Sequence, residues 1–160
     1  MSASASRAGR DQPDWLDPEL ATLTQGRFSD PGWIFERKLD GERCLAFSSG
    51  GQVRLMTRNQ KDDTSTYPEI AGALAGQRAG DFIVDGEIVA FADARTSFSL
   101  LQQRLGVRYP GPDLIASVPA FFYIFDVLWA DGRDTRSLPR QAACLPHSRP
   151  IMANRGLQRR

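Results

Sequence analysis

The stretch FERKLDGERCLAF, residues 35–47, contains Lys38, one of only two lysines in a chain of 160 residues. Lys38 lies in a strand-like pattern and is followed by Asp40-Gly41, a strong signal for a two-residue hairpin turn. Arginine supplies 18 of the 20 basic residues, so an amine at this position stands out. An amine can lose its proton and act as a nucleophile, whereas a guanidinium effectively cannot. The stretch therefore predicts a hairpin that carries a candidate nucleophile.

Strand-like runs continue on both sides of this pair. Alternation over residues 33–39 puts Glu36 and Lys38 on the same face, and residues 43–47 supply the returning strand. Residues 52–59 form a third predicted strand after the Gly50-Gly51 turn, and the most apolar runs, 82–91 and 120–129, predict two more.

Two segments carry helical signals. Residues 68–78 open with Pro68 and space Ile70 and Leu74 four apart, as an amphipathic helix does. Ser97 is a predicted N-cap for a helix over residues 98–105. Strands of this order with few helices predict an α+β fold, with mainly antiparallel sheets and flanking helices.

The bulk composition limits the class of protein. A hydrophobic content of 41% and a charged content of 24% are typical of one soluble globular domain. No segment has the features of a signal peptide or the ~18 apolar residues of a membrane span, which predicts a cytoplasmic protein with no membrane partner. Cys44 and Cys144 are expected to be reduced thiols. The net charge of +1 decides nothing about nucleic acid, because the distribution of charge matters more than its sum.

Charged residues recur where a core would be apolar. Arg43 follows the predicted turn, and Arg58 interrupts the third strand within Thr-Arg-Asn. Asp85 and Glu87 flank Gly86 inside the apolar run 82–91, where a carboxylate is costly unless it is paired or holds a ligand or metal. These residues, together with Lys38, form the candidate site.

The ordered motifs resemble those of the covalent nucleotidyltransferases, the superfamily of ATP-dependent DNA ligases, RNA ligases and mRNA capping enzymes. KLDGER at 38–43 is similar to the KxDGxR signature, TRN at 57–59 to the second arginine motif, VDGEIVAF at 84–91 to the DGE motif, and FYIFDVLWADG at 122–132 to the aromatic motif. The flanking text, from about Leu20 to Leu138, resembles bacterial ATP-dependent DNA ligases, including the ligase domains of end-joining enzymes.

The resemblance implies a partial, ATP-grasp-like adenylation domain that forms lysyl-AMP from ATP and passes AMP to the 5′-phosphate of nicked or broken duplex DNA, in repair and recombination in the bacterial cytosol. Lys38 would be the nucleophile, with a pKa lowered from about 10.4 by nearby cations and partial burial. The nucleotide-binding residues carried over from the family are Glu36, Arg43, Arg58, Glu87 and Phe125.

Each of these residues takes a role from the resemblance. Glu36 would lie near adenine and Phe125 would stack on it. Arg43 and Arg58 would contact the AMP or the DNA 5′-phosphate. Glu87 would engage the ribose and help to hold Mg²⁺, a hard cation suited to phosphate and carboxylate oxygens. End-joining proteins or a completing domain are the expected protein partners.

The end of the sequence departs from the family pattern. We expect a disordered arm over 1–15, a partial adenylation domain over 16–138, and a basic irregular tail over 139–160, with no OB-fold domain and no lysine after Lys61. Two interpretations of the composition after Asp134 stay open: a basic tail that binds nucleic acid, or out-of-frame coding. Two alternative functions also stay open: a catalytically incomplete remnant that at most binds nucleotide or DNA, and an RNA ligase or other covalent nucleotidyltransferase.

Overall fold

A five-stranded antiparallel sheet, in the order β2-β1-β3-β6-β7, forms the body of the computed structural model, which describes residues 11–18, 38–77 and 79–138. The large strands are β1 (Glu42–Ser49), β2 (Gln52–Thr57), β3 (Phe82–Val89) and β6 (Phe121–Ala130), and β7 is Arg133–Asp134. A separate hairpin joins β4 (Phe91–Ala92) and β5 (Arg95–Thr96). The helices are α1 (Pro68–Ala75), α2 (Phe98–Leu101) and α3 (Pro112–Ser117). The predicted α+β class with a mainly antiparallel sheet is confirmed.

Two tight turns connect neighbouring strands as the sequence suggests. Gly50 and Gly51 have φ angles of 56° and 80° between β1 and β2, and Asp131 and Gly132 have φ angles of 48° and 80° between β6 and β7. Positive φ at both central residues matches the twist of an antiparallel pair, and it favours glycine.

The predicted hairpin around Asp40-Gly41 is wrong. β1 pairs with β2 along one edge and with β3 along the other, so a strand over 33–39 has no free edge along 44–47 to pair with. Residues 38–40 are irregular, and residues 33–37 lie outside the described part of the chain. Gly41 serves another purpose: a Cβ there would lie 2.1 Å from the carbonyl oxygen of Ile88. The glycine therefore permits the chain to pass close against the end of β3.

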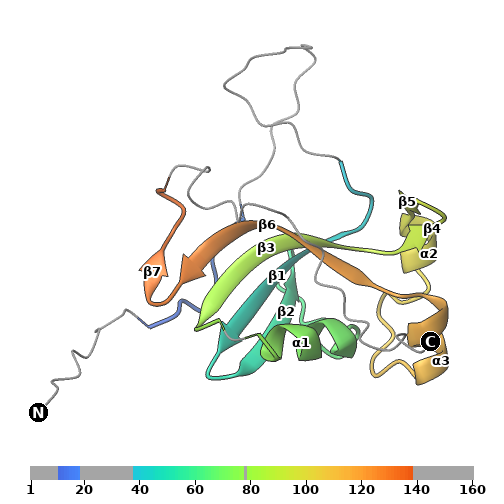
Figure 1. The fold of residues 1–160 in the computed structure, drawn as a ribbon, viewed down its shortest axis with the longest axis horizontal. Helices are drawn as coiled ribbons and strands as arrows, with labels where there is room; N and C mark the ends of the chain where they lie inside the picture. The colour runs from blue at the N-terminus through green and yellow to red at the C-terminus, as the bar shows by residue number, and fades with distance from the viewer. Residues whose placement is uncertain (1–10, 19–37, 78, 139–160) are drawn as a thin grey trace, which may run out of the picture.

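Side chains alternate between two cores on opposite faces of the sheet. One face packs against α1 through Cys44, Ala46 and Val84, and it buries Ile70 and Leu74 as predicted. The other face buries Leu45, Phe47, Ile83, Leu128 and Trp129 together with Leu16. Figure 1 shows α1 along one side of the sheet, with β4, β5, α2 and α3 gathered at the end where β3 finishes and β6 begins.

The helices are shorter than predicted. α1 ends at Ala75, and Ser97 caps α2 as expected, its hydroxyl accepting from the Leu100 amide at 3.3 Å. α2 stops at Leu101 because tight turns follow, the amide of Arg104 bonding to the carbonyl of Leu101 and carrying the Arg104 side chain inward. The sequence analysis did not predict α3. No helix in the described ranges has the length and apolar character needed to cross a membrane.

The segment over residues 11–18 lies on the sheet, although residues 1–15 were expected to be a disordered arm. The Gln12 amide donates to the carbonyl oxygens of Ser48 (2.9 Å) and Phe82 (3.0 Å). Trp15 stacks on Phe47 with ring centroids 5.9 Å apart. These contacts tie two neighbouring strands together and cover part of the second core.

Candidate functional site

Arg43, Asp85 and Phe125 meet on three neighbouring strands. The Arg43 guanidinium donates to both carboxylate oxygens of Asp85, at 2.6 Å through Nε and 2.5 Å through Nη2. Its Cζ lies 4.6 Å from the centroid of the Phe125 ring. The Asp85 side chain is 1% exposed and that of Arg43 is 27% exposed, so the carboxylate is sealed while the arginine side chain is partly exposed. A bidentate pair with a planar support fixes the guanidinium in one orientation.

A bulge in β6 places the aromatic ring. Asp85 pairs with Asp126, whereas the next residue, Gly86, pairs with Ile124, so Phe125 is the extra residue at a register shift. Bulges turn a side chain out of its regular alternation and are common beside functional sites. Gly86 is needed at this point, because a Cβ there would lie 2.4 Å from the Tyr123 carbonyl oxygen. Asp85 is therefore explained by its pairing with Arg43, and Gly86 by the close approach of β6 to β3.

Glu87 lies directly opposite Arg43 in the β1–β3 register. Partial burial raises the pKa of its carboxyl, while the Arg43 charge and a hydrogen bond from the Gly41 amide oppose that rise. Burial also raises the pKa of Asp85, against the two bonds from Arg43, and the bond to Asp85 raises the pKa of Arg43. The site thus holds one cation between two carboxylates, one sealed and one half-buried.

Lys38 is exposed and lies just before the approach of Gly41 to β3. Asp40 anchors this segment: its amide donates to the Thr96 hydroxyl at 3.2 Å, and its carboxylate accepts from the Phe98 amide at 3.2 Å. Asp40 was expected in a turn, and this anchoring role was not predicted. The residue that carries the signal is the aspartate of KLDGER itself, since a short acceptor can bond free backbone amides.

The remaining predicted residues are not brought into this group. Arg58 lies in the turn after β2, exposed, and no hydrogen bond or ion pair joins it to another residue in the part of the chain that the structure describes. Glu36 lies outside the described residues. The structure thus groups Arg43, Glu87 and Phe125 with Asp85, whose carboxylate was expected to be paired or to hold a ligand or metal and is paired with Arg43.

Magnesium was predicted at Glu87. In the described ranges no three His, Cys, Asp or Glu side chains form a group that could hold a metal ion. Mg²⁺ commonly uses one or two carboxylates together with substrate phosphates and water. Asp85 is committed to Arg43, and the half-buried Glu87 carboxylate is the oxygen donor of the group that fits such a site.

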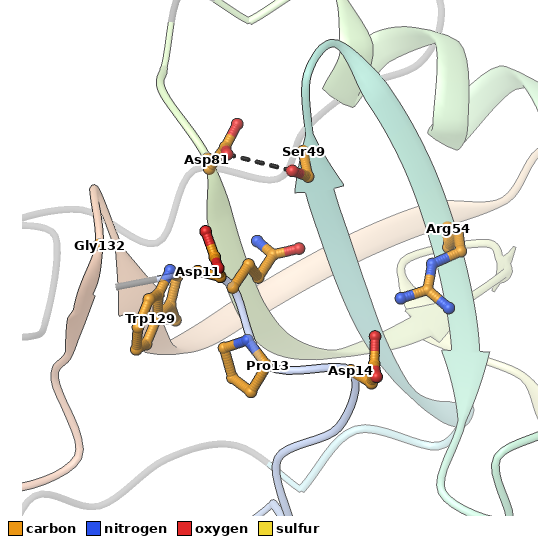
Figure 2. A pocket seen from close by; sticks show the side chains of 9 residues that line it. Asp11, Pro13, Asp14, Ser49, Arg54, Asp81, Trp129 and Gly132 are labelled. Atoms are coloured by element: carbon orange, nitrogen blue, oxygen red, sulfur yellow. Dashed lines mark hydrogen bonds between the residues drawn. The ribbon is translucent and has the colours of Figure 1, made fainter. Parts of the chain in front are cut away.

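A pocket of 340 Å³ lies at the opposite end of the sheet (Figure 2). Asp11, Asp14, Asp81, Arg54 and Trp129 line it, beside the β1–β2 turn. Asp81 accepts from the Ser49 hydroxyl at 3.1 Å and from the Gly50 amide at 3.0 Å, so it holds that turn to the start of β3. The pocket does not belong to the group around Arg43.

Comparison with known proteins gives one consistent family. A family model described as an ATP dependent DNA ligase domain matches residues 18–144. The chain is 41% identical over 110 residues to the probable DNA ligase of Opitutus terrae, covering 67% of this chain and 10% of that protein. It is 33% identical over 127 residues to the multifunctional non-homologous end joining protein LigD of Pseudomonas aeruginosa, covering 79% of this chain and 14% of that protein.

Solved structures agree with this result. The ligase domain from M. tuberculosis LigD matches with a TM-score of 0.56 and 33% identity over 68% of this chain and 33% of that chain. A mycobacterial DNA ligase D complexed with ATP and MES matches with a TM-score of 0.53 and 31% identity over the same shares. The chain therefore spans a third or less of the length of these relatives.

Proposed function

Because the chain belongs to the ATP-dependent DNA ligase domain family, we propose that it carries the nucleotide-accepting half of an adenylation domain, a partial ATP-grasp-like nucleotidyltransferase fold, in the bacterial cytosol. Lys38 is the proposed nucleophile. Its neutral Nζ attacks the α-phosphorus of ATP, a P–N bond forms, the bond to the bridging oxygen breaks, and pyrophosphate leaves. The nitrogen bonded to phosphorus then loses one proton to solvent, and lysyl-AMP is the product.

One observation supports this proposal above the others: three motifs far apart in the sequence meet at one end of the sheet. Arg43, Glu87 and Phe125 come from β1, β3 and β6, and the Arg43–Asp85 pair fixes their centre. Asp40 tethers the segment of Lys38 to the start of α2 beside them. A preorganised cation near a transferring phosphoryl group lowers the barrier without reorganisation during the reaction.

The residues of the group take separate roles in the proposal. Arg43, held by Asp85 and partly exposed, binds a phosphate or ribose oxygen through its guanidinium. Phe125, a half-buried ring, is proposed to contact adenine, and Glu36 is proposed to contact the same base. Glu87 receives the ribose, and it would hold Mg²⁺, which supplies charge neutralisation for the phosphates when bound.

DNA is the proposed acceptor of the AMP. Arg58, exposed after β2, is proposed to bind either the AMP or the 5′-phosphate at a nick. The complete reaction includes transfer to the 5′-phosphate and attack by the neighbouring 3′-hydroxyl. Completion of those steps by this chain, with end-joining proteins or a completing domain as partners, is also part of the proposal.

A labelling experiment tests the first step. The purified chain is incubated with ATP labelled at the α-phosphate and Mg²⁺, then denatured and separated on a gel. Label that survives denaturation on the wild type and on Arg133→Ala, an exposed control, and is absent from Lys38→Arg supports the proposal. A folded wild type that takes no label would sink it, and nucleotide binding without label would favour the catalytically incomplete remnant.

A further inference from the structure

The loop between α2 and α3 exposes large hydrophobic side chains, which are few among the described residues. In the described ranges three large hydrophobic side chains are exposed, and two belong to this loop: Val107 (37%) and Tyr109 (82%). An isolated exposed apolar residue needs no explanation, but a ring displayed so fully beside charged residues indicates a contact surface.

The backbone holds this ring in a costly conformation. Tyr109 has a φ of 52°, a left-handed value that a bulky residue rarely adopts. Its amide donates to the Ser65 carbonyl oxygen at 2.8 Å, and the Val107 amide donates to that of Arg104 at 3.0 Å. Arg104 is fully buried and bonds the carbonyl oxygens of Thr66 and Val118. Tertiary structure thus fixes the loop, and strain of this kind persists where the surrounding structure enforces it.

Positive charge surrounds the ring. Arg108 is exposed and precedes Tyr109, whose amide hydrogen bond to the Ser65 carbonyl brings this loop beside the segment that carries Lys61 and Asp62, and the charge of Arg108 acts on both. Lys61 is exposed and belongs to the same turn as Arg58, closed by a bond of 2.9 Å from the Thr57 amide to the Lys61 carbonyl. We name the set of Arg58, Lys61, Arg108 and Tyr109 the Tyr109 patch.

The cations of the Tyr109 patch are accessible to a binding partner. Neither Arg58 nor Arg108 has a hydrogen bond or ion pair to another residue over the ranges that the structure describes. Lys61 is paired with Asp63 at 2.8 Å, yet its side chain is 60% exposed. Two carboxylates belong to the same turn, the exposed Asp62 and the buried Asp63, so the patch carries three exposed cations against one exposed and one buried carboxylate.

The Tyr109 patch lies at the end of the sheet that carries the candidate site. Thr57, the last residue of β2, pairs with Cys44, the neighbour of Arg43, and Arg58 follows it. A partner bound to the patch would therefore reach past the edge of β2 toward Arg43 and Lys38.

We infer that the Tyr109 patch binds the sugar–phosphate backbone of duplex DNA beside the nick. Arg58, Lys61 and Arg108 contact phosphates, and the Tyr109 ring packs against a deoxyribose. Exposed cations fit a polyanion, and a rigid ring adds apolar contact at little entropic cost. The inference rests on the proposed function, since it names the surface through which that substrate is positioned.

The test measures DNA affinity apart from lysyl-AMP formation. A fluorescent nicked duplex with a 5′-phosphate is titrated with the full chain at several salt concentrations, without ATP. Arg108→Ala should weaken binding roughly threefold to tenfold and lower the slope of log K against log salt by about 1. Tyr109→Gly should weaken binding at an unchanged slope, and because glycine accepts positive φ, this variant removes the ring without adding strain.

The controls separate this inference from the proposed function. Arg133→Ala removes an exposed arginine from β7, at the far end of the sheet, and should leave affinity and slope unchanged. Arg108→Ala and Tyr109→Gly should take label from ATP as the wild type does, so a failure of labelling bears on Lys38 alone. If a protein carrying both Arg108→Ala and Tyr109→Gly bound the nicked duplex with wild-type affinity and salt slope, the inference would be overturned. A wild type that binds no DNA would also overturn it, and would point to a protein partner for the patch.

Discussion

Two arginines of this molecule each combine a carboxylate with an aromatic ring, and they differ in what they leave open. Arg104 is 0% exposed; it bonds Glu69 at 2.8 Å, two backbone carbonyls, and lies 5.4 Å from the Tyr67 ring. Arg43 bonds the sealed Asp85 and lies over Phe125, but 27% of its side chain is exposed. Arg104 uses its two terminal nitrogens to bond Glu69 and the two carbonyls and is closed to solvent, whereas the Arg43 side chain is held in place and partly exposed. The difference separates a structural arginine from one suited to bind a ligand.

The largest effect should come from breaking the buried Arg104–Glu69 pair. Arg104→Met removes a buried cation and leaves Glu69 and the carbonyls of Thr66 and Val118 without donors. We expect the free energy of unfolding in urea to fall by about 3–5 kcal/mol. Arg133→Ala, at an exposed site, should change it by less than about 0.5 kcal/mol. A loss below about 1 kcal/mol in Arg104→Met would show that the buried network does not stabilise this fold.

Breaking the Arg43–Asp85 pair should reduce labelling from ATP more than it reduces the free energy of unfolding. Asp85→Asn keeps the shape but removes the charge that orients Arg43, so we expect label from ATP to fall more than about tenfold while the free energy of unfolding falls by about 1–3 kcal/mol. The matched control is Asp81→Asn, an exposed carboxylate just before β3. Full labelling in Asp85→Asn would remove Arg43 from the proposed site.

The aromatic support can be weakened without removing the apolar contact. Phe125→Leu keeps a hydrophobic side chain at the bulge but loses the ring face, a contribution of about 0.5–2 kcal/mol to holding a cation. We expect the KM for ATP in the labelling reaction to rise severalfold. Phe121→Leu, at another half-buried ring of β6, should leave the KM unchanged. Equal effects of the two changes would mean that the ring only fills the core.

The smallest expected effect is on the pH dependence of stability, through Glu42 and its hydrogen bond from Tyr67. The Tyr67 hydroxyl donates to Glu42 at 3.1 Å, and burial together with the Asp63 charge raises the pKa of Glu42 above its ordinary value of 4.5. The folded state then binds this proton more tightly than the unfolded state, so stability falls as pH rises through that raised pKa. Glu42→Gln should flatten the fall of unfolding free energy as the pH rises above the ordinary value of 4.5. Parallel profiles for the two proteins would contradict this assignment.

Local patterns predicted the elements better than their partners. The strands at 43–47, 82–91 and 120–129, the Ser97 cap and the Gly50-Gly51 turn depend on neighbours in the sequence, and all are present in the structure. The Asp40-Gly41 hairpin failed because the same dipeptide suits a turn or a close approach, and only the crowding against Ile88 distinguishes the two.

The role of Arg104 could not be predicted for a related reason. The acceptors that bury its side chain come from Thr66 and Val118, 38 and 14 residues away. The Arg43–Asp85 pair spans 42 residues in the same way. A satisfied buried charge depends on distant partners, which a local pattern does not contain.

The sequence by itself determined the chemistry available: an amine at Lys38, a guanidinium at Arg43, two carboxylates inside an apolar strand, and glycines where the chain must pass closely. Tertiary structure alone decided that Asp85 is sealed and Glu87 half-open, that Phe125 is turned toward Arg43 by a bulge, and that Asp40 anchors the segment of Lys38. The physical reason is that the register between distant strands is set by packing on both faces of the sheet, and a shift of one residue moves every side chain to the other face.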